Sequence, residues 1–149
     1  MDHQIRTAQP SDADAISRLM AVLGYELAPD QVKQTLASYQ RQSGAVLVAT
    51  EDGRVVGFLS AYASPLFHQL GSLGRITAMA IDPVHFRKGI GASLLEAAEQ
   101  FAMERGCLRM EVTSGDHREQ DAHLFYLAQG YEPDCRRFIK RLPRLSGSA

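Results

Sequence analysis

The residues best placed to do chemistry form a short glycine-containing loop, Lys88-Gly89-Ile90-Gly91-Ala92. The loop follows an apolar run and a proline-marked turn, and it leads into a long stretch with helical spacing of apolar residues. The first amides of a helix lack partners within the helix, and the helix dipole places roughly half a positive charge there. A strand–loop–helix corner of this kind is suited to hold a phosphate group, and Arg87 and Lys88 add cations beside it.

Two common nucleotide-binding patterns do not fit this loop. The dinucleotide fingerprint requires a third small residue at the position of Leu94. The phosphate loop of nucleotide hydrolases requires a Gly-Lys-Ser/Thr sequence, which is absent. A nucleotide-binding protein is therefore disfavoured.

The elements that position the loop follow from the spacing of apolar residues. The pattern predicts a strand at 76–81, a helix at 90–105 and a second strand at 108–114. The predicted helix buries one face, formed by Ile90, Leu94, Leu95, Ala98, Phe101 and Ala102. A strand–helix–strand crossover implies that the two strands are parallel, and ligands of such sheets lie at the carboxyl ends of the strands. The glycine loop stands at that end.

The rest of the chain supplies further strands and helices. We expect a short strand at 5–8, helices beginning near residues 11 and 30, and a hairpin of strands 45–50 and 55–61 around Asp52-Gly53. A short helix that ends at Gly130 and a strand at 137–140 complete the pattern.

Length and composition limit the function classes. With 149 residues, 45% apolar and 22% charged residues and a net charge of -1, we expect one domain at 1–142 and a loosely ordered tail at 143–149. The composition does not indicate a nucleic-acid binder, and no apolar stretch is long enough to cross a bilayer. The N-terminal sequence lacks the apolar region of a signal peptide, so we expect a cytoplasmic protein. Cys107 and Cys135 lack the spacing of metal ligands, and no metal site is expected.

Two motifs, in order along the chain, resemble those of the GCN5-related N-acetyltransferases, the GNAT family. The acetyl-CoA loop of that family reads Arg/Gln-x-x-Gly-x-Gly/Ala after an apolar-Asp-Pro turn. Here Asp82-Pro83 supplies the turn, Gly89 and Gly91 match the glycines, and Phe86 stands at the Arg/Gln position. The stretch AHLFYLAQGY at 122–131 resembles the closing motif of the family. Together with the residues that follow, it is similar to small-molecule acetyltransferases of the aminoalkylphosphonate type.

The resemblance implies a fold and a cosubstrate. We expect a GNAT-like mixed α/β (α+β) fold with a mainly antiparallel sheet of six or seven strands, one splayed parallel pair, and helices on both faces. The cosubstrate would be acetyl-CoA, with its pantetheine arm paired to the backbone of Met79, Ala80 and Ile81. Its diphosphate would lie in the loop, formed by Arg87, Lys88, Gly89, Ile90, Gly91 and Ala92. Relatives often dimerise through C-terminal strands, so a homodimer is left open.

Acetyl transfer from a thioester to an amine sets three chemical requirements. The amine, whose ammonium form has a pKa of ~10.4, must be neutral. The developing oxyanion needs a hydrogen-bond donor, and the departing thiolate benefits from an acid near sulfur. Tyr126 matches the tyrosine that family members commonly use as that acid. The strand residues Thr77–Ala80 offer no base; the alternatives are selection of an already neutral amine, or one of Glu111, Asp116, His117 and His123.

A small-molecule primary amine is the preferred acceptor, with Tyr25, His68, Glu111 and His123 as candidate substrate residues. In the resembled family the region between the first two helices shapes the acceptor site, so Glu26 and Tyr39 are candidates as well. A peptide or protein amine is the second alternative. A third alternative is a non-catalytic acyl-CoA sensor. Ala78 and Phe86 support this alternative because they depart from the pattern of the family. Many relatives have a glutamate on the strand of Ala78 and an Arg or Gln at the position of Phe86.

Overall fold

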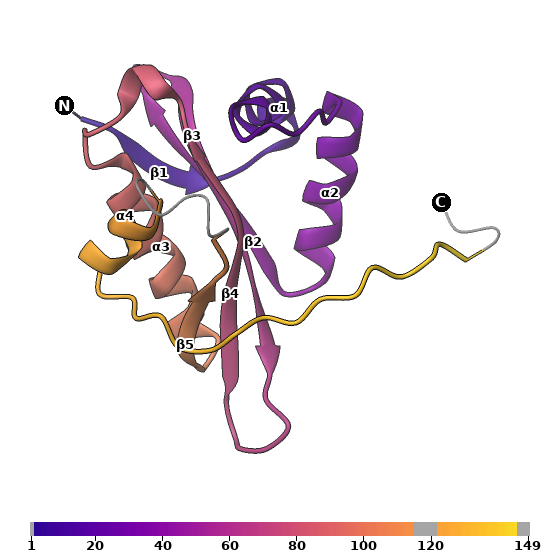
Figure 1. Ribbon diagram of the computed structural model, residues 1–149. Coiled ribbons are helices and arrows are strands. Elements are labelled where there is room, and N and C mark those ends of the chain that lie inside the picture. The colour runs from indigo at the N-terminus through magenta and orange to yellow at the C-terminus, as the bar shows by residue number, and fades with distance from the viewer. Residues whose placement is uncertain (1, 115–121, 146–149) are drawn as a thin grey trace. The chain divides into compact units, whose positions relative to one another are not determined.

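Five strands form one mixed sheet in the computed structural model, which describes residues 2–114 and 122–145 (Figure 1). The chain divides into two units, Met1–Thr113 and Ser114–Ala149. The sheet belongs to the first unit and has the order β1-β2-β3-β4-β5. Its strands are β1 (Gln4–Thr7), β2 (Gly44–Glu51), β3 (Arg54–Pro65), β4 (Ser72–Ile81) and β5 (Cys107–Val112).

The strand pairing confirms the predicted mixed fold. Strands β1 to β4 pair antiparallel with their neighbours, and β5 pairs parallel with β4. The β2–β3 hairpin turns at Asp52 and Gly53, whose φ values of 52° and 76° are both left-handed, as a tight hairpin turn requires. The predicted crossover from β4 through a helix to β5 is also present.

Helices cover both faces of the sheet. Figure 1 shows α1 (Ala13–Val22) and α2 (Pro29–Arg41) on one face and α3 (Ile90–Glu104) on the other. Apolar side chains of α1 and α2 pack with those of β2 and β3 into one cluster, which includes Ile16, Leu19, Val32, Leu36, Val48 and Phe58. The predicted face of α3 is buried at Ile90, Leu94, Leu95, Ala98 and Ala102, while Phe101 is only partly buried.

Gly57 on β3 allows α3 to lie close to the sheet. A Cβ atom at this position would lie 3.0 Å from Ile81 Cδ1, 3.2 Å from Ile90 Cγ2 and 3.3 Å from Leu94 Cδ1. Interiors are packed to near-crystalline density, so a larger side chain there would displace these atoms. Gly57 therefore allows close packing between β3 and the first turns of α3.

A bulge interrupts β4 at Thr77. Ser60 of β3 lies opposite Ala78 and Ala61 lies opposite Ile76, which leaves Thr77 without a partner residue on β3. Ala78 packs against the core under α1 and α2, and the Thr77 hydroxyl contacts Ser60 on the same face. The bulge therefore turns two consecutive side chains toward α2.

The parallel pair extends along only part of β4. Pairing with β5 runs from Ser72↔Cys107 to Ile76↔Val112. Beyond Ile76, β4 continues to Ile81 with β3 as its partner. In residues 2–114 and 122–145, the opposite edge of β4 from Thr77 to Ile81 has no strand beside it, which is the opening expected of a splayed pair.

An ion pair fixes the connection from β1 to α1. The Arg6 guanidinium donates hydrogen bonds of 2.8 and 3.0 Å to the carboxylate of Asp12, which lies in the 3-10 turn η1 (Pro10–Asp12). The Gln9 backbone N–H donates a third at 2.8 Å. Asp12 is buried, and the hydrogen bonds from Arg6 lower its pKa below the ordinary value.

The second unit contains α4 (Leu124–Ala128), which is followed by Gly130 with a left-handed φ of 92°. The prediction of a strand at 137–140 is wrong, because residues 132–145 form neither helix nor strand. Phe138 and Ile139 are exposed there. Alternation of apolar and charged residues forms a strand only against a neighbouring edge, and the described residues of this unit contain no other strand. The described sheet accordingly has five strands rather than six or seven.

None of the described helices has the length and apolar character needed to cross a membrane.

Candidate active site

The glycine loop connects β4 through the turn η2 to α3. Asp82 begins it by accepting a 3.1 Å hydrogen bond from the Val84 backbone N–H, which starts the 3-10 turn η2 (Pro83–His85). Gly89 precedes α3 with a left-handed φ of 79°, and the helix then continues in the right-handed conformation. A left-handed residue followed by a right-handed one turns successive N–H groups toward a common point, and such a nest binds anions. The free amides at the start of α3 add to this site.

Two side chains of this corner are held by one buried carboxylate. Glu51, at the end of β2, lies 3.2 Å from His85 Nδ1 and 3.6 Å from Lys88 Nζ, and only 7% of its side chain is exposed. Arg87 is exposed, and within the described residues it has no acidic partner. Glu51 therefore holds Lys88 close to the protein and leaves Arg87 as the mobile cation of the loop.

The free edge of β4 starts at this corner. The Asp82 N–H donates a 2.8 Å hydrogen bond to the Val56 carbonyl on β3. Backbone groups alternate in direction along a strand, so those of Met79 and Ile81 point to the opposite edge, away from β3. Ala80 is buried, and its side chain belongs to the core under α1 and α2. An extended ligand arm would thus pair with the backbone of Met79 and Ile81.

Comparison with known proteins identifies the family. The sequence model of the Acetyltransferase (GNAT) family matches residues 14–131. The chain belongs to this family. Members of this family are acetyltransferases, and both sequence motifs described above lie within the matched residues.

Two curated relatives and one solved structure illustrate the similarity. The chain is 34% identical over 95 residues to aminoalkylphosphonate N-acetyltransferase of Salmonella typhimurium, a match covering 64% of this chain and 61% of that protein. It is 32% identical over 140 residues to the uncharacterized N-acetyltransferase YhfO of Bacillus subtilis, covering 87% of this chain and 90% of the relative. The crystal structure of glucosamine-6-phosphate N-acetyltransferase from Arabidopsis thaliana superposes with a TM-score of 0.80 at 16% identity. The superposition covers 96% of this chain and 100% of that protein's chain. At that identity the structure shows the shared fold alone.

Tyr126, predicted to be the general acid, lies on α4 in the second unit. Its ring makes edge contacts with the rings of Phe125 and Tyr131, with centroids 5.2 and 5.8 Å away. His123 directly precedes α4. Asp116 and His117 lie outside the described residues. The catalytic role of Tyr126 stays a prediction.

The other candidate substrate residues lie in different parts of the first unit. Tyr25 is exposed in the connection from α1 to α2. His68 is exposed in the loop from β3 to β4, at the opposite end of β4 from the glycine corner. Glu111 binds two arginines, with one oxygen 3.1 Å from Arg75 and the other 2.7 Å from Arg109. The structure does not bring these three residues together around the corner.

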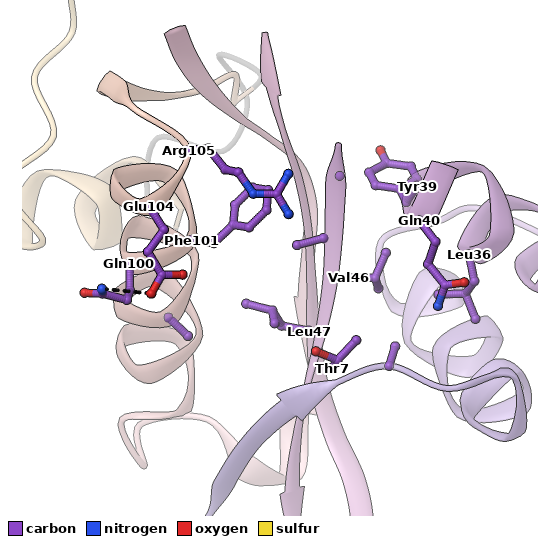
Figure 2. Close-up of a pocket in the computed structure, with 14 residues that line it drawn as sticks. Thr7, Leu36, Tyr39, Gln40, Val46, Leu47, Gln100, Phe101, Glu104 and Arg105 are labelled. Carbon is purple, nitrogen blue, oxygen red and sulfur yellow. Dashed lines mark hydrogen bonds between the residues drawn. The ribbon is translucent and has the colours of Figure 1, made fainter. Parts of the chain in front are cut away.

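A pocket of about 340 Å³ lies beside the β1–β2 edge, between α2 and α3 (Figure 2). Tyr39 and Leu36 line it on the α2 side, and Phe101 and Arg105 line it on the α3 side. None of the cosubstrate-binding residues predicted from the sequence lines this pocket. The pocket therefore does not coincide with the predicted cosubstrate site. Phe101 lines the pocket, which explains why its side chain is only partly buried.

Sequence reasoning missed two polar clusters of the site. Glu51 is 34 positions from His85 in the chain. The second cluster joins Tyr39, Thr77 and Ser60, with Tyr39 and Thr77 separated by 38 positions. Neither cluster has a local sequence signal, because each is made by the packing of separate elements.

Proposed function

We propose that the chain transfers an acetyl group from acetyl-CoA to a primary amine of a small molecule, by direct attack in a ternary complex. The observation that carries this proposal is the continuity between two binding features. The glycine corner offers convergent amides for a diphosphate, and the free edge of β4 begins immediately beside it. Acetyl-CoA would supply the activated acetyl group.

The backbone does most of the cosubstrate binding in this proposal. Gly89, Ile90 and Gly91 direct their amides at the diphosphate, and Arg87 adds a mobile positive charge. Met79 and Ile81 offer the backbone groups that an extended arm needs for pairing. A backbone N–H of β4 on the free edge is suited to donate to the oxyanion.

Tyr126 is proposed as the acid that protonates the departing thiolate, whose conjugate acid has a pKa of ~8.5. The family match extends from residue 14 to residue 131 and so includes parts of both units. This supports a single acetyltransferase domain to which both units contribute.

Direct attack is favoured over an acetylated cysteine. Burial raises the pKa of the Cys107 thiol, which reduces the thiolate available as a nucleophile at neutral pH. Cys135 is exposed on the C-terminal segment, where no described residue serves as its base.

A small amine is the proposed acceptor because the first relative named above is an aminoalkylphosphonate N-acetyltransferase. The match spans 61% of that protein, so its substrate is a guide for the choice of assay compounds. Purified protein should be mixed with acetyl-CoA and a panel of aminoalkylphosphonates, amino sugars, polyamines and peptides, with thiol release followed by a chromogenic reagent. Turnover with a small primary amine is expected. Binding of acetyl-CoA with no acceptor in the panel would instead favour an acyl-CoA sensor.

The role of Tyr126 is tested with Tyr126→Phe. Loss of a general acid should reduce kcat on the best amine by roughly 100-fold. Tyr131→Phe, which alters the neighbouring ring, should retain kcat within about two-fold. Equal rates for Tyr126→Phe and the unaltered enzyme across pH would contradict the assignment.

A further inference from the structure

Three hydroxyl groups form a chain on the α2 face of the sheet, at the bulge in β4. Tyr39 Oη lies 2.6 Å from Thr77 Oγ1, and Thr77 Oγ1 lies 2.7 Å from Ser60 Oγ. Thr77 Oγ1 also lies 3.2 Å from the backbone carbonyl oxygen of Ser60. Ser60 is buried, Tyr39 is partly buried and Thr77 is exposed, so the chain leads from the sheet interior to its surface.

One arrangement of the hydroxyl protons satisfies all three contacts. A carbonyl oxygen only accepts, so Thr77 donates its single hydroxyl proton to the Ser60 carbonyl. Ser60 Oγ and Tyr39 Oη must then both donate to Thr77 Oγ1. The Tyr39 hydroxyl proton is therefore committed to Thr77. Its oxygen retains acceptor capacity for a donor that approaches from the exposed side.

Packing holds Tyr39 in this position. A Cβ atom on Gly44 would lie 2.6 Å from Tyr39 Cδ2 and 3.1 Å from the Tyr39 carbonyl oxygen, so the glycine makes room for the ring beside β2. Figure 2 shows the Tyr39 side chain on the α2 side of the sheet. A ring held on one side by β2 and at its hydroxyl by Thr77 is preorganised for binding.

The bulge lies where the proposed acyl arm would end. From Ile81 back to Thr77 the free edge of β4 spans five residues, or ~16 Å at ~3.3 Å per residue. Beyond that point Ile76 pairs with Val112 of β5, which closes the opening. An arm that enters at the glycine corner therefore ends beside Thr77, and an acceptor must approach there.

We propose that Tyr39 is an acceptor-binding residue whose oxygen accepts a hydrogen bond from the N–H of the incoming neutral primary amine. Thr77 and Ser60 are positioning residues that fix the direction of the Tyr39 hydroxyl. This inference rests on the proposed function, because it locates the acceptor relative to the acyl arm. It adds a specificity-determining contact that is separate from the general acid.

The test separates the two substrates kinetically in the 149-residue chain. Tyr39→Phe should lower kcat/KM for the amine by about ten-fold and leave the KM for acetyl-CoA unchanged, since one hydrogen bond of about 1.4 kcal/mol is lost. Thr77→Val should act in the same direction, while Thr77→Ser, which restores the hydroxyl, should recover the activity. Ser38→Ala is the matched control, because that hydroxyl lies on the same helix and contacts Arg41 at 3.4 Å.

Each outcome decides the proposal. If the unaltered enzyme turns over and Tyr39→Phe matches it on the amine, the acceptor role is wrong while the transferase function stands. If Tyr39→Phe alters the KM values of both substrates equally, the residue is structural and the inference is overturned. Should Tyr39→Phe fail to fold, the Thr77→Val and Thr77→Ser pair gives the same decision. Absence of turnover with every amine would overturn the proposed function and this inference with it.

Discussion

In the function proposed above, the two ends of the free edge of β4 would recognise their ligands by different means. At the Ile81 end, recognition comes from the backbone: a left-handed Gly89, the amides of α3 and the edge of the strand itself. At the Thr77 end, it comes from side chains of α2, β3 and β4 that meet through packing. The first end is encoded by one contiguous stretch, and the second is encoded by residues far apart in the chain.

This difference separates recognition by backbone groups from recognition by side chains. Any side chain can stand beside a backbone nest without changing its amides, so the cosubstrate end tolerates variation in side chains. The acceptor end changes its hydrogen-bonding pattern whenever one of three side chains changes. Substitutions at the two ends should therefore have separable kinetic effects.

Among changes at the cosubstrate end, the largest effect is expected at Gly89, whose conformation creates the proposed nest. Gly89→Ala must hold an alanine at a φ of 79°, although its Cβ would meet no atom within 4 Å. We expect acetyl-CoA affinity to fall by roughly 30-fold, or about 2 kcal/mol, measured by calorimetry. Gly106→Ala is the control, because Gly106 follows the other end of α3 with a φ of 75° and equally open surroundings. Equal losses in both variants would show that strain rather than the nest governs binding.

A change remote from both ends should affect stability alone. Asp12→Asn removes the carboxylate that Arg6 binds, which should lower the free energy of unfolding at pH 7 by about 1.5 kcal/mol. The pKa of Asp12 is lower in the folded state than in the unfolded chain, so this stabilisation is present above pH ~5 and is lost as the pH falls below ~4. Urea unfolding measures the free energy of unfolding of both proteins. Asp12→Asn should differ from the unaltered protein more at pH 7 than at pH 3. Changed KM values would argue that the β1–α1 corner contributes to the site.

A side chain at the cosubstrate end should matter less than the backbone there. Glu51→Gln weakens the attachment of His85 and Lys88 to the end of β2 without changing the amides. We expect the KM for acetyl-CoA to rise by about five-fold, close to 1 kcal/mol, with the amine KM unchanged. A lower KM for acetyl-CoA would mean that Glu51 restrains cations that otherwise bind phosphate.

The smallest effect is expected from Phe86→Arg, which introduces the residue type of the family pattern. Phe86 is 55% exposed, so a cation placed there would be screened by water. The KM for acetyl-CoA should fall by no more than about three-fold, in steady-state assays at low and high salt. A much larger decrease would show that side chains at this end contribute as much as the backbone.

The cosubstrate end could be predicted from the sequence because its signals are local. The turn at Asp82, the glycines of the loop and the apolar face of α3 all lie within thirty residues, and the structure contains each of them. The hairpin at Asp52-Gly53 was equally accessible, since its left-handed turn requires those residue types.

At the proposed acceptor end, Tyr39 was a candidate from the sequence, but its contacts could not be predicted because no local pattern encodes them. The bulge at Thr77 depends on the register between β3 and β4, which the sequence of either strand leaves undetermined. The hydroxyl chain depends on this register. The Glu51 cluster depends on the packing of the end of β2 against His85 and Lys88. At 137–140 the local pattern indicated a strand, but a strand also needs an edge to pair with, and local sequence does not supply one.

Gly57 gives the loop a dependence on a residue more than thirty positions before it. A Cβ atom at position 57 would crowd Ile90 and Leu94 in the first turns of α3, the helix whose N-terminal amides form the proposed anion site. Replacing the loop alone to change the cosubstrate preference would therefore leave the packing of α3 against β3 unchanged. A designer would need to treat β3 and the loop as one inseparable module.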